Sequence, residues 1–442
     1  MTTVYKIDIT TSPAPVLSNE RAQILDVLRG FAILGILLDN MFGFTGYFFM
    51  GEEQMQALPT WPADGILGML ELAFVHGKFY SLFSLLFGIG FSIILWRNEQ
   101  KGVNPMKIFY RRMLVLLIIG FVHVYFMWPG DILLLYAILG FILPVFRKAS
   151  NKTLLYWAAA LILSPILIDV LKVVFQFRTG AFLETIAEKI DKRNGINSFA
   201  DLFNFIYGET AGWNEFWKSQ QAGFLYRYAY IIESNRIPKV LGMFLLGLYV
   251  GRKRLYAHIG EHVQLLKKLK KWGFLIGIPV SIAMAFFEID GKRIPAAAGL
   301  WDTISYAFGV VPLSLAYTAA ICLAWFHRRE TSFWNRLTPA GRMALTNYLV
   351  QTIICVFLFY SIGFRLGGNI GPSLFFPIAV AIYILQVVFS TWWLRHFNYG
   401  PVEWIWRQLT YGKILPLKKT KELHLSDNLK TPSISEKETT LL

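Results

Sequence analysis

Charged residues and cysteines are both scarce in this sequence, and each shortage excludes a class of protein. Only 16% of the 442 residues are charged, whereas soluble domains carry about 25%, so an ordinary soluble fold is excluded. The two cysteines, Cys322 and Cys355, lie in apolar runs without CxxC or metal-ligand spacing. This argues against a disulfide framework. The sequence also lacks Walker, GxSxG, dinucleotide-binding and protein-kinase motifs, so it shows no sign of the enzymes that those motifs mark.

One short stretch of sequence resembles a metal-binding motif. Residues His258–His262 read HIGEH, which matches the inverted zinc-protease motif HxxEH. Gly260 weakens the helix that this motif needs, and the string lies in a short basic loop. We therefore predict no metal site.

What the chain has in abundance is apolar sequence, since 55% of its residues are hydrophobic. Several runs reach the roughly 20 apolar residues that cross a bilayer. The sequence predicts an all-α, polytopic membrane helix bundle with about ten spans: 25–45, 66–96, 108–128, 131–147, 153–176, 237–251, 273–289, 301–326, 343–362 and 374–395. The second span is too long for one straight crossing, so we expect it to break near Gly77.

Basic residues set the expected orientation. Lys and Arg gather in alternate connecting segments, and the positive-inside rule then places both termini in the cytoplasm. The net charge of +15 is explained by this topology, so we expect a lipid bilayer as the surrounding partner and no nucleic acid. The first span lacks a cleavage site and is expected to act as its own insertion signal.

The spans divide the chain into five parts. We expect residues 1–24 to form a cytoplasmic segment, 25–176 and 237–412 to form five-helix membrane segments, and 413–442 to be a disordered cytoplasmic tail. Residues 177–236 form a long extracytoplasmic loop. The apolar spacing within this loop predicts short amphipathic helices at Ala181–Ile190 and Phe199–Tyr207, which we expect to form a cap over the site.

The strongest functional signal is a set of polar residues near the predicted outer ends of the first four spans. Intramembrane charge is costly, so such residues face the bundle interior and mark candidate sites. His123 and Asp131 belong to one hairpin and form a candidate base with its orienting carboxylate. They differ in depth by roughly 7–8 Å, so contact requires tilted helices or an unwound turn. Alternatively, His123 bonds a backbone carbonyl and Asp131 caps the next helix.

Four further residues belong to this candidate catalytic set. Lys78 either holds an anion, pairs with Asp131 or extends to the interface. His76 lies beside it at the expected break. Asn40 either stabilises an oxyanion or bonds a neighbouring helix, and Asp39 is harder to explain structurally because it is charged.

Basic residues at the predicted inner face form a second candidate set. Arg29 lies one helical turn after Asp26, so an internal ion pair is the simple interpretation. Arg29, Arg342, Asn347 and Arg407 would also suit the phosphates of a donor that arrives from the cytoplasm. Ordinary positive-inside topology explains the same arginines.

Five strings in order resemble the bacterial YeiB family of multi-spanning membrane proteins. They are LDVLRGFAILGILLDN (25–40), KFYSLFSLLFGIG (78–90), GDILLLYAILG (130–140), GRMALTNYL (341–349) and GPVEWIWRQLTYG (400–412). The family is distantly similar to transmembrane acyltransferases such as the lysosomal heparan-α-glucosaminide N-acetyltransferase. The resemblance implies a bacterial cytoplasmic membrane protein, acyl-CoA as donor and no covalently bound cofactor. Asn40 stands where the sugar O-acetyltransferases carry an essential His, so His123 or His76 would be the substitute base.

Two functions remain open from the sequence. The first is an acyltransferase that moves an acyl group from cytoplasmic acyl-CoA to an envelope sugar or lipid. The second is a proton-coupled transporter or lipid-handling protein that uses the same polar cluster. A continuous tunnel favours the transferase, and paired broken helices at the midplane favour the transporter. For the transferase we expect His123→Ala and Asp131→Asn to abolish activity without unfolding the protein.

Overall fold

The computed structural model describes residues 22–289, 294–329 and 331–419. Every named element in these ranges is helical, and β-type pairing among the described residues is limited to one isolated bridge between Phe397 and Lys418. The predicted all-α fold is therefore confirmed. The segment expected at residues 1–24 falls almost entirely outside the described residues.

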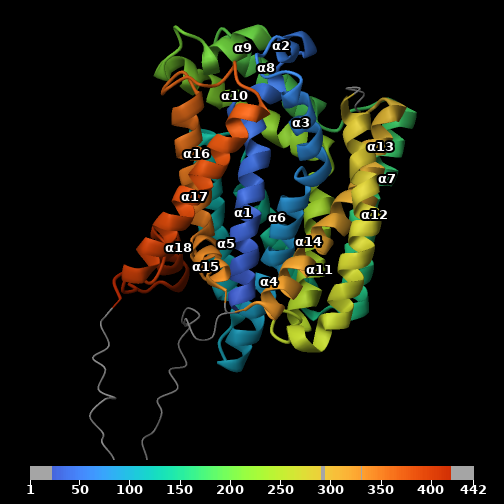
Figure 1. Ribbon diagram of the computed structural model, residues 1–442, viewed down its shortest axis with the longest axis vertical. Coiled ribbons are helices and arrows are strands. Elements are labelled where there is room, and N and C mark those ends of the chain that lie inside the picture. Colours follow the sequence, from blue (N-terminus) through green and yellow to red (C-terminus); the bar gives the residue numbers. More distant parts are fainter. Residues whose placement is uncertain (1–21, 290–293, 330, 420–442) are drawn as a thin grey trace, which may run out of the picture.

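Twelve α-helices build the bundle (Figure 1). They are α1 (Gln23–Phe44), α3 (Ala63–Phe74), α4 (Lys78–Gln100), α5 (Pro105–Val122), α6 (Leu133–Ile142), α7 (Asn151–Phe175), α11 (Arg236–Arg252), α12 (Val263–Ile289), α13 (Leu300–Ser305), α14 (Val311–His327), α16 (Ala344–Phe359) and α17 (Pro372–His396). Six more flank it: α2 (Glu52–Gln56), α8 (Ala181–Arg193), α9 (Phe199–Tyr207), α10 (Trp213–Glu233), α15 (Ser332–Arg342) and α18 (Pro401–Tyr411). Short 3₁₀ turns are η2 (Tyr47–Phe49), η4 (Leu143–Lys148), η5 (Ile259–His262) and η6 (Ala297–Gly299), and π-helical turns are η3 (His123–Met127) and η7 (Tyr306–Val310).

The expected count of ten spans is not confirmed by the length and composition of the helices. Within the described residues, seven helices are long and apolar enough to cross a membrane, or eight if α15 and α16, which meet at a 76° bend, form one broken span. All ten predicted segments contain helix, but α6 has only 10 residues and α11 only 17. Most residues of these two helices are buried, although Ile138, Ile142 and Ile237 are exposed. The sequence cannot separate such a helix from a full crossing, because both are apolar.

The predicted break in the second span is present. α3 ends at Phe74, α4 begins at Lys78, and Gly77 between them has φ +81°. A residue with a side chain rarely adopts this backbone conformation, whereas glycine does so readily. The break turns the polar residues around it towards the bundle interior.

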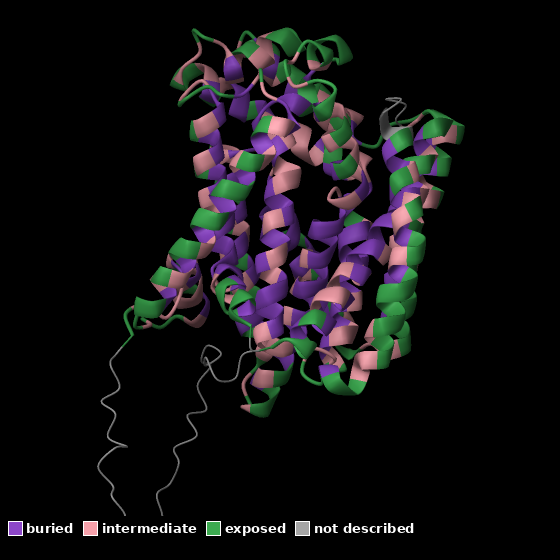
Figure 2. Ribbon diagram, in the orientation of Figure 1, coloured by how far each residue is buried: buried purple, intermediate pink, exposed green. Residues whose placement is uncertain are grey.

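Helix α1 lies at the centre of the bundle and packs against α4, α15, α16 and α17. Figure 2 shows the buried residues concentrated along these helices, while the outward faces of α12 and α17 are exposed. Helices α4 and α11 pack closely, and both present glycine at their contact. A Cβ on Gly88 would overlap the carbonyl oxygen of Phe244, and one on Gly247 would overlap that of Leu85. The backbones therefore touch, as small residues permit in membrane bundles.

The two ends of the bundle differ. Helices α8, α9 and α10 cover one end, which we call the cap end, and Tyr207 of α9 fixes them there by donating to the carbonyl oxygens of Gly43 and Phe44 at 3.2 and 3.1 Å. The amphipathic helices predicted in this loop are confirmed as α8 and α9.

Helix α1 begins and α18 lies at the opposite end, which we call the terminal end (Figure 1). The described parts of both chain ends thus share one side of the bundle; that this side is cytoplasmic stays a prediction. The predicted disordered tail begins too early, because Leu417 and Lys419 pair with the backbone after α17. The rest of that tail lies outside the described residues.

The glycine contact between α4 and α11 gives a stability prediction. Gly88→Ala should destabilise the protein by about 1–3 kcal/mol, because the added methyl group forces two backbones apart. Gly90→Ala on the same helix meets open space and should be neutral or slightly stabilising. Thermal unfolding of the two purified variants measures the difference; equal unfolding temperatures would contradict the packing described.

Candidate functional site

His123 and Asp131 touch, although they lie at different depths of a regular hairpin. The π-helical turn His123–Met127 and the non-helical residues 128–132 shift both side chains from their regular positions. As a result, Nδ1 of His123 lies 2.8 Å from an Asp131 carboxylate oxygen. The unwinding that the sequence argument required is present in the structure.

This pair is sealed inside the protein. The exposed fractions of the two side chains are 0% and 1%. Nε2 of His123 lies 2.8 Å from the hydroxyl of Thr352, and the second oxygen of Asp131 accepts from the backbone N–H of Leu134 at 2.7 Å. Asp131 therefore does cap α6, whereas His123 bonds side chains rather than a backbone carbonyl. With both ring nitrogens occupied and no solvent access, His123 is poorly placed to act as a base. Sequence reasoning missed Thr352, because Thr is common in apolar helices.

A second histidine pair lies nearer the cap end. Nδ1 of His76, in the break between α3 and α4, is 2.8 Å from a carboxylate oxygen of Asp39 on α1. Their side chains are 30% and 29% exposed, so this pair is accessible as well as polar. The sequence named both residues but predicted no contact between them.

Glu71 on α3 completes this group, which we call the break cluster: Asp39, Glu71 and His76. Their ligand atoms lie within 4.8 Å of one another. Lys78 contributes a positive charge beside Glu71, and His76 already bonds Asp39, so we assign no metal to the cluster. Glu71 was missed, although an acidic residue inside a predicted span is the signal that identified the others.

The structure places Lys78 and Asn40 in different surroundings. Lys78 is fully buried and its ammonium donates to the carbonyl oxygen of Leu72 at 2.7 Å. It satisfies the carbonyl end of α3, so extension to the membrane interface is wrong. Asn40 is half-buried and lines a small cavity of about 20 Å³ near the cap end. We call this cavity the outer pocket; Asp39, Tyr80, Arg227, Arg236 and Tyr348 also line it.

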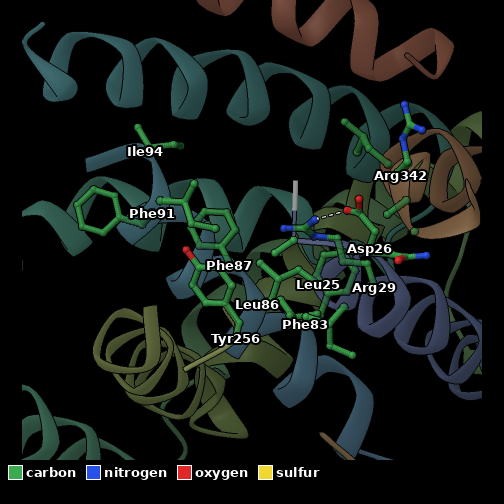
Figure 3. Close-up of a pocket in the computed structure, with 18 of the residues that line it drawn as sticks. Leu25, Asp26, Arg29, Phe83, Leu86, Phe87, Phe91, Ile94, Tyr256 and Arg342 are labelled. Atoms are coloured by element: carbon green, nitrogen blue, oxygen red, sulfur yellow. Dashed lines mark hydrogen bonds and ion pairs between the residues drawn. The ribbon is translucent and has the colours of Figure 1, made fainter. Parts of the chain in front are cut away.

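A much larger cavity of about 1250 Å³, which we call the inner chamber, starts at the terminal end. Figure 3 shows Arg29 and Arg342 at one side of it and aromatic and aliphatic side chains, such as Phe87 and Phe91, along its length. Arg29 forms the predicted ion pair with Asp26 at 2.7 Å. The chamber is thus basic at its mouth and apolar further in.

The inner candidates separate into two groups. Arg29, Arg342 and Arg407 all line the chamber. Asn347 does not belong to its lining; its side chain donates to the carbonyl oxygen of Ala340 and to Ser390, both at 3.1 Å. Its predicted place among the donor-binding residues is therefore wrong, because its amide stabilises the bend between α15 and α16. Sequence reasoning could not distinguish these uses, since both place the residue near the inner end of a helix.

The other side of that bend is held by an acid that the sequence did not single out. Glu403 of α18 accepts from the backbone N–H groups of Leu345 and Thr346 at 2.8 and 3.0 Å, so it caps the start of α16. Burial raises the pKa of Glu403, which these hydrogen bonds oppose. Glu403 also lines the chamber and joins its wall to the bend.

The inner chamber and the outer pocket share part of their lining, which we call the junction. Ile36, Ile132 and Tyr348 line both cavities. The Tyr348 hydroxyl is buried without a hydrogen-bond partner among the described residues, and its ring lies 5.1 Å from that of His123. The sealed histidine therefore positions the tyrosine at the junction.

The fold and these cavities define a multi-pass α-helical membrane protein with a large inner chamber and a polar cluster beside the break between α3 and α4. Comparison with known proteins places the chain among bacterial relatives. It is 32% identical over 416 residues to the uncharacterised protein YxaH of Bacillus subtilis, covering 93% of this chain and all of the relative. It is 30% identical to the uncharacterised protein YeiB of Escherichia coli, covering 88% of this chain and 96% of the relative.

A family model described as a protein of unknown function, DUF418, matches residues 250–413. A third relative, a 39.9 kDa protein of Bacillus acidopullulyticus, is 28% identical over 92% of this chain and 99% of its own length. No solved structure matches the chain. The chain belongs to the YeiB family.

The sealed pair changes the mutational expectation for His123. His123→Ala should destabilise the protein by about 3–5 kcal/mol, because it leaves the buried Asp131 carboxylate without its partner. Unfolding in denaturant measures this loss. Exposed His396 is the control, and His396→Ala should change stability by about 0.5 kcal/mol or less. If His123→Ala unfolds like the unaltered protein, the pair does not contribute to stability as described.

Proposed function

We propose that the protein is an acyltransferase of the bacterial cytoplasmic membrane, which transfers an acyl group from cytoplasmic acyl-CoA to an envelope sugar or lipid at the outer face. The supporting observation is that the inner chamber and the outer pocket share the lining residues Ile36, Ile132 and Tyr348. A donor that enters from one side can meet an acceptor from the other there. In this proposal the terminal end is cytoplasmic.

The donor would bind along the inner chamber. Guanidinium groups hold phosphates through charge-assisted, often bidentate hydrogen bonds, and Arg29, Arg342 and Arg407 provide three at the mouth. The apolar walls beyond them suit the pantetheine arm. Ten residues of α1 separate Arg29 from Asp39, which is about 15 Å along the helix axis, so the arm must span much of the chamber.

The reaction would take place at the junction. His76, oriented by Asp39, removes a proton from the acceptor hydroxyl or amine, whose oxygen or nitrogen attacks the thioester carbonyl carbon. The resulting oxyanion accepts a hydrogen bond from the Tyr348 hydroxyl. Collapse of the tetrahedral intermediate breaks the carbon–sulfur bond, and the CoA thiolate takes the proton from His76. His123 acts on this step only through Tyr348.

A second helix break is the one observation that favours the transporter alternative, but the distance between the two breaks argues against a transporter. A second break, between α15 and α16, accompanies the break at Gly77. In transporters with inverted repeats, broken helices meet at a shared site near the midplane. Here Gly341 packs on Asp26, whereas His76 bonds Asp39. The two breaks are thus offset along α1 by about 13 residues, or roughly 20 Å, and do not form one site.

Substitution of the proposed base tests the assignment. His76→Gln should lower the rate of acyl-CoA-dependent transfer by a factor of about 10²–10⁴, because general base catalysis is lost, while the Kd for CoA stays unchanged. The readout is release of free CoA thiol by protein reconstituted with bacterial envelope extract as acceptor. Exposed His396→Gln is the matched control and should retain full activity. Full turnover by His76→Gln would exclude His76 as the base.

The donor site has a separate test. Arg29→Gln should weaken CoA binding by about tenfold, through the loss of a charge-assisted hydrogen bond. Isothermal titration calorimetry on purified protein measures this Kd. No measurable CoA binding by the unaltered protein would argue against a CoA-dependent enzyme.

A further inference from the structure

Arg236 is a buried cation without a carboxylate at ion-pair distance among the described residues; the Asp39 carboxylate attracts it only from farther away. It opens α11, its exposed fraction is 8%, and its guanidinium lies over the rings of Tyr80 and Tyr230, at 4.7 and 5.3 Å from their centres. Among the described residues, no carboxylate lies within 4 Å of it and no hydrogen bond satisfies its five N–H donors. Buried arginines in proteins are normally paired, so a hydrogen-bond acceptor for the Arg236 guanidinium is missing here.

The tyrosines explain how the cation is tolerated without using its donors. Ring faces attract a guanidinium electrostatically, but they accept no conventional hydrogen bond in the plane of the group. The N–H groups therefore remain available at the rim of the rings. Arg236 lines the outer pocket, into which such donors can point.

A second guanidinium lines the same pocket. Arg227 of α10 donates to the backbone carbonyl oxygens of Asp131 and Gly130 at 3.0 and 3.3 Å, and no carboxylate lies within 4 Å of it in the described part of the chain. The one carboxylate that lines the pocket, that of Asp39, is already bonded to His76. The pocket thus carries two guanidinium groups against one engaged acid.

We infer that Arg236 and Arg227 form a binding site for an oxyanion, either a carboxylate or a phosphate. The outer pocket holds about 20 Å³, which suits one terminal oxygen of such a group rather than a whole molecule. Asp39 lines the same pocket, so an anion held there lies beside the break cluster. The identity of the ligand rests on the proposed function. If the protein is an acyltransferase, the oxyanion belongs to the acceptor, which is therefore an acidic sugar or an anionic lipid.

Direct binding tests the site without any acyl transfer. The probes are sodium phosphate and sodium acetate as free oxyanions, and phosphatidylglycerol against phosphatidylcholine in mixed micelles. Each is titrated into purified protein at constant ionic strength, and the thermal unfolding temperature is followed. We expect a saturable rise with the free anions, with phosphatidylglycerol, or with both. A response to free anions alone supports a soluble acidic acceptor, and a response to phosphatidylglycerol alone supports a lipid headgroup.

Variants on α11 make the test specific. Arg236→Gln should weaken anion binding by about tenfold or more. Without anion, its unfolding temperature should be close to that of the unaltered protein, because the substitution removes an unpaired buried charge. Arg236→Lys keeps the charge but loses the planar fork, so its affinity should be intermediate. The control Arg252→Gln lies at the other end of the same helix, where Arg252 donates to the carbonyl oxygens of Phe146 and Ala149; it should lose stability and bind anions normally.

The outcomes separate the two proposals. No saturable response to any anion, or equal binding by Arg236→Gln and the unaltered protein, overturns the anion site. Anion binding that depends on Arg236, in a protein without acyl transfer, leaves the site standing and removes its role for an acyl acceptor.

Discussion

The contact between Asp39 and His76 across the break at Gly77 is the interaction on which the proposed site depends. A continuous helix from α3 into α4 would carry His76 away from α1 and leave the Asp39 charge in an apolar bundle, which is costly. The positive φ of Gly77 lets the chain turn there. The same turn places the Lys78 ammonium on the last carbonyl groups of α3. One glycine thus brings a carboxylate, an imidazole and a cation close to the break between α3 and α4.

The two histidines have different environments, which suit His123 to a structural role and His76 to the proposed catalytic role. His123 is sealed between Asp131 and Thr352, so it joins the α5–α6 hairpin to α16. His76 has a comparable carboxylate partner but retains exposure. Tyr348 packs its ring on His123 and belongs to the lining of both cavities. A rigid, sealed pair can hold such a side chain in place better than a solvated one.

Much of the fold follows from the sequence, because hydropathy and glycine have direct physical consequences. The helical bundle, the break at Gly77, the Asp26–Arg29 ion pair and the cap helices were all predictable. Depth along a helix was also predictable, but the direction in which a side chain points was not. For that reason the pairing of Asp39 with His76, the partner Thr352 and the structural use of Asn347 came only from the structure. Arg236 was missed because positive-inside counting treats a basic residue as topology rather than as a site.

The central claim is that the chamber leads a CoA-linked acyl group to the break cluster. An experimental structure with a non-hydrolysable acyl-CoA analogue tests it most directly. The account predicts phosphate density at Arg29 and Arg342 and the analogue's carbonyl group between Ile36 and Tyr348. An empty chamber at saturating analogue, or phosphates bound at the cap end, would contradict it.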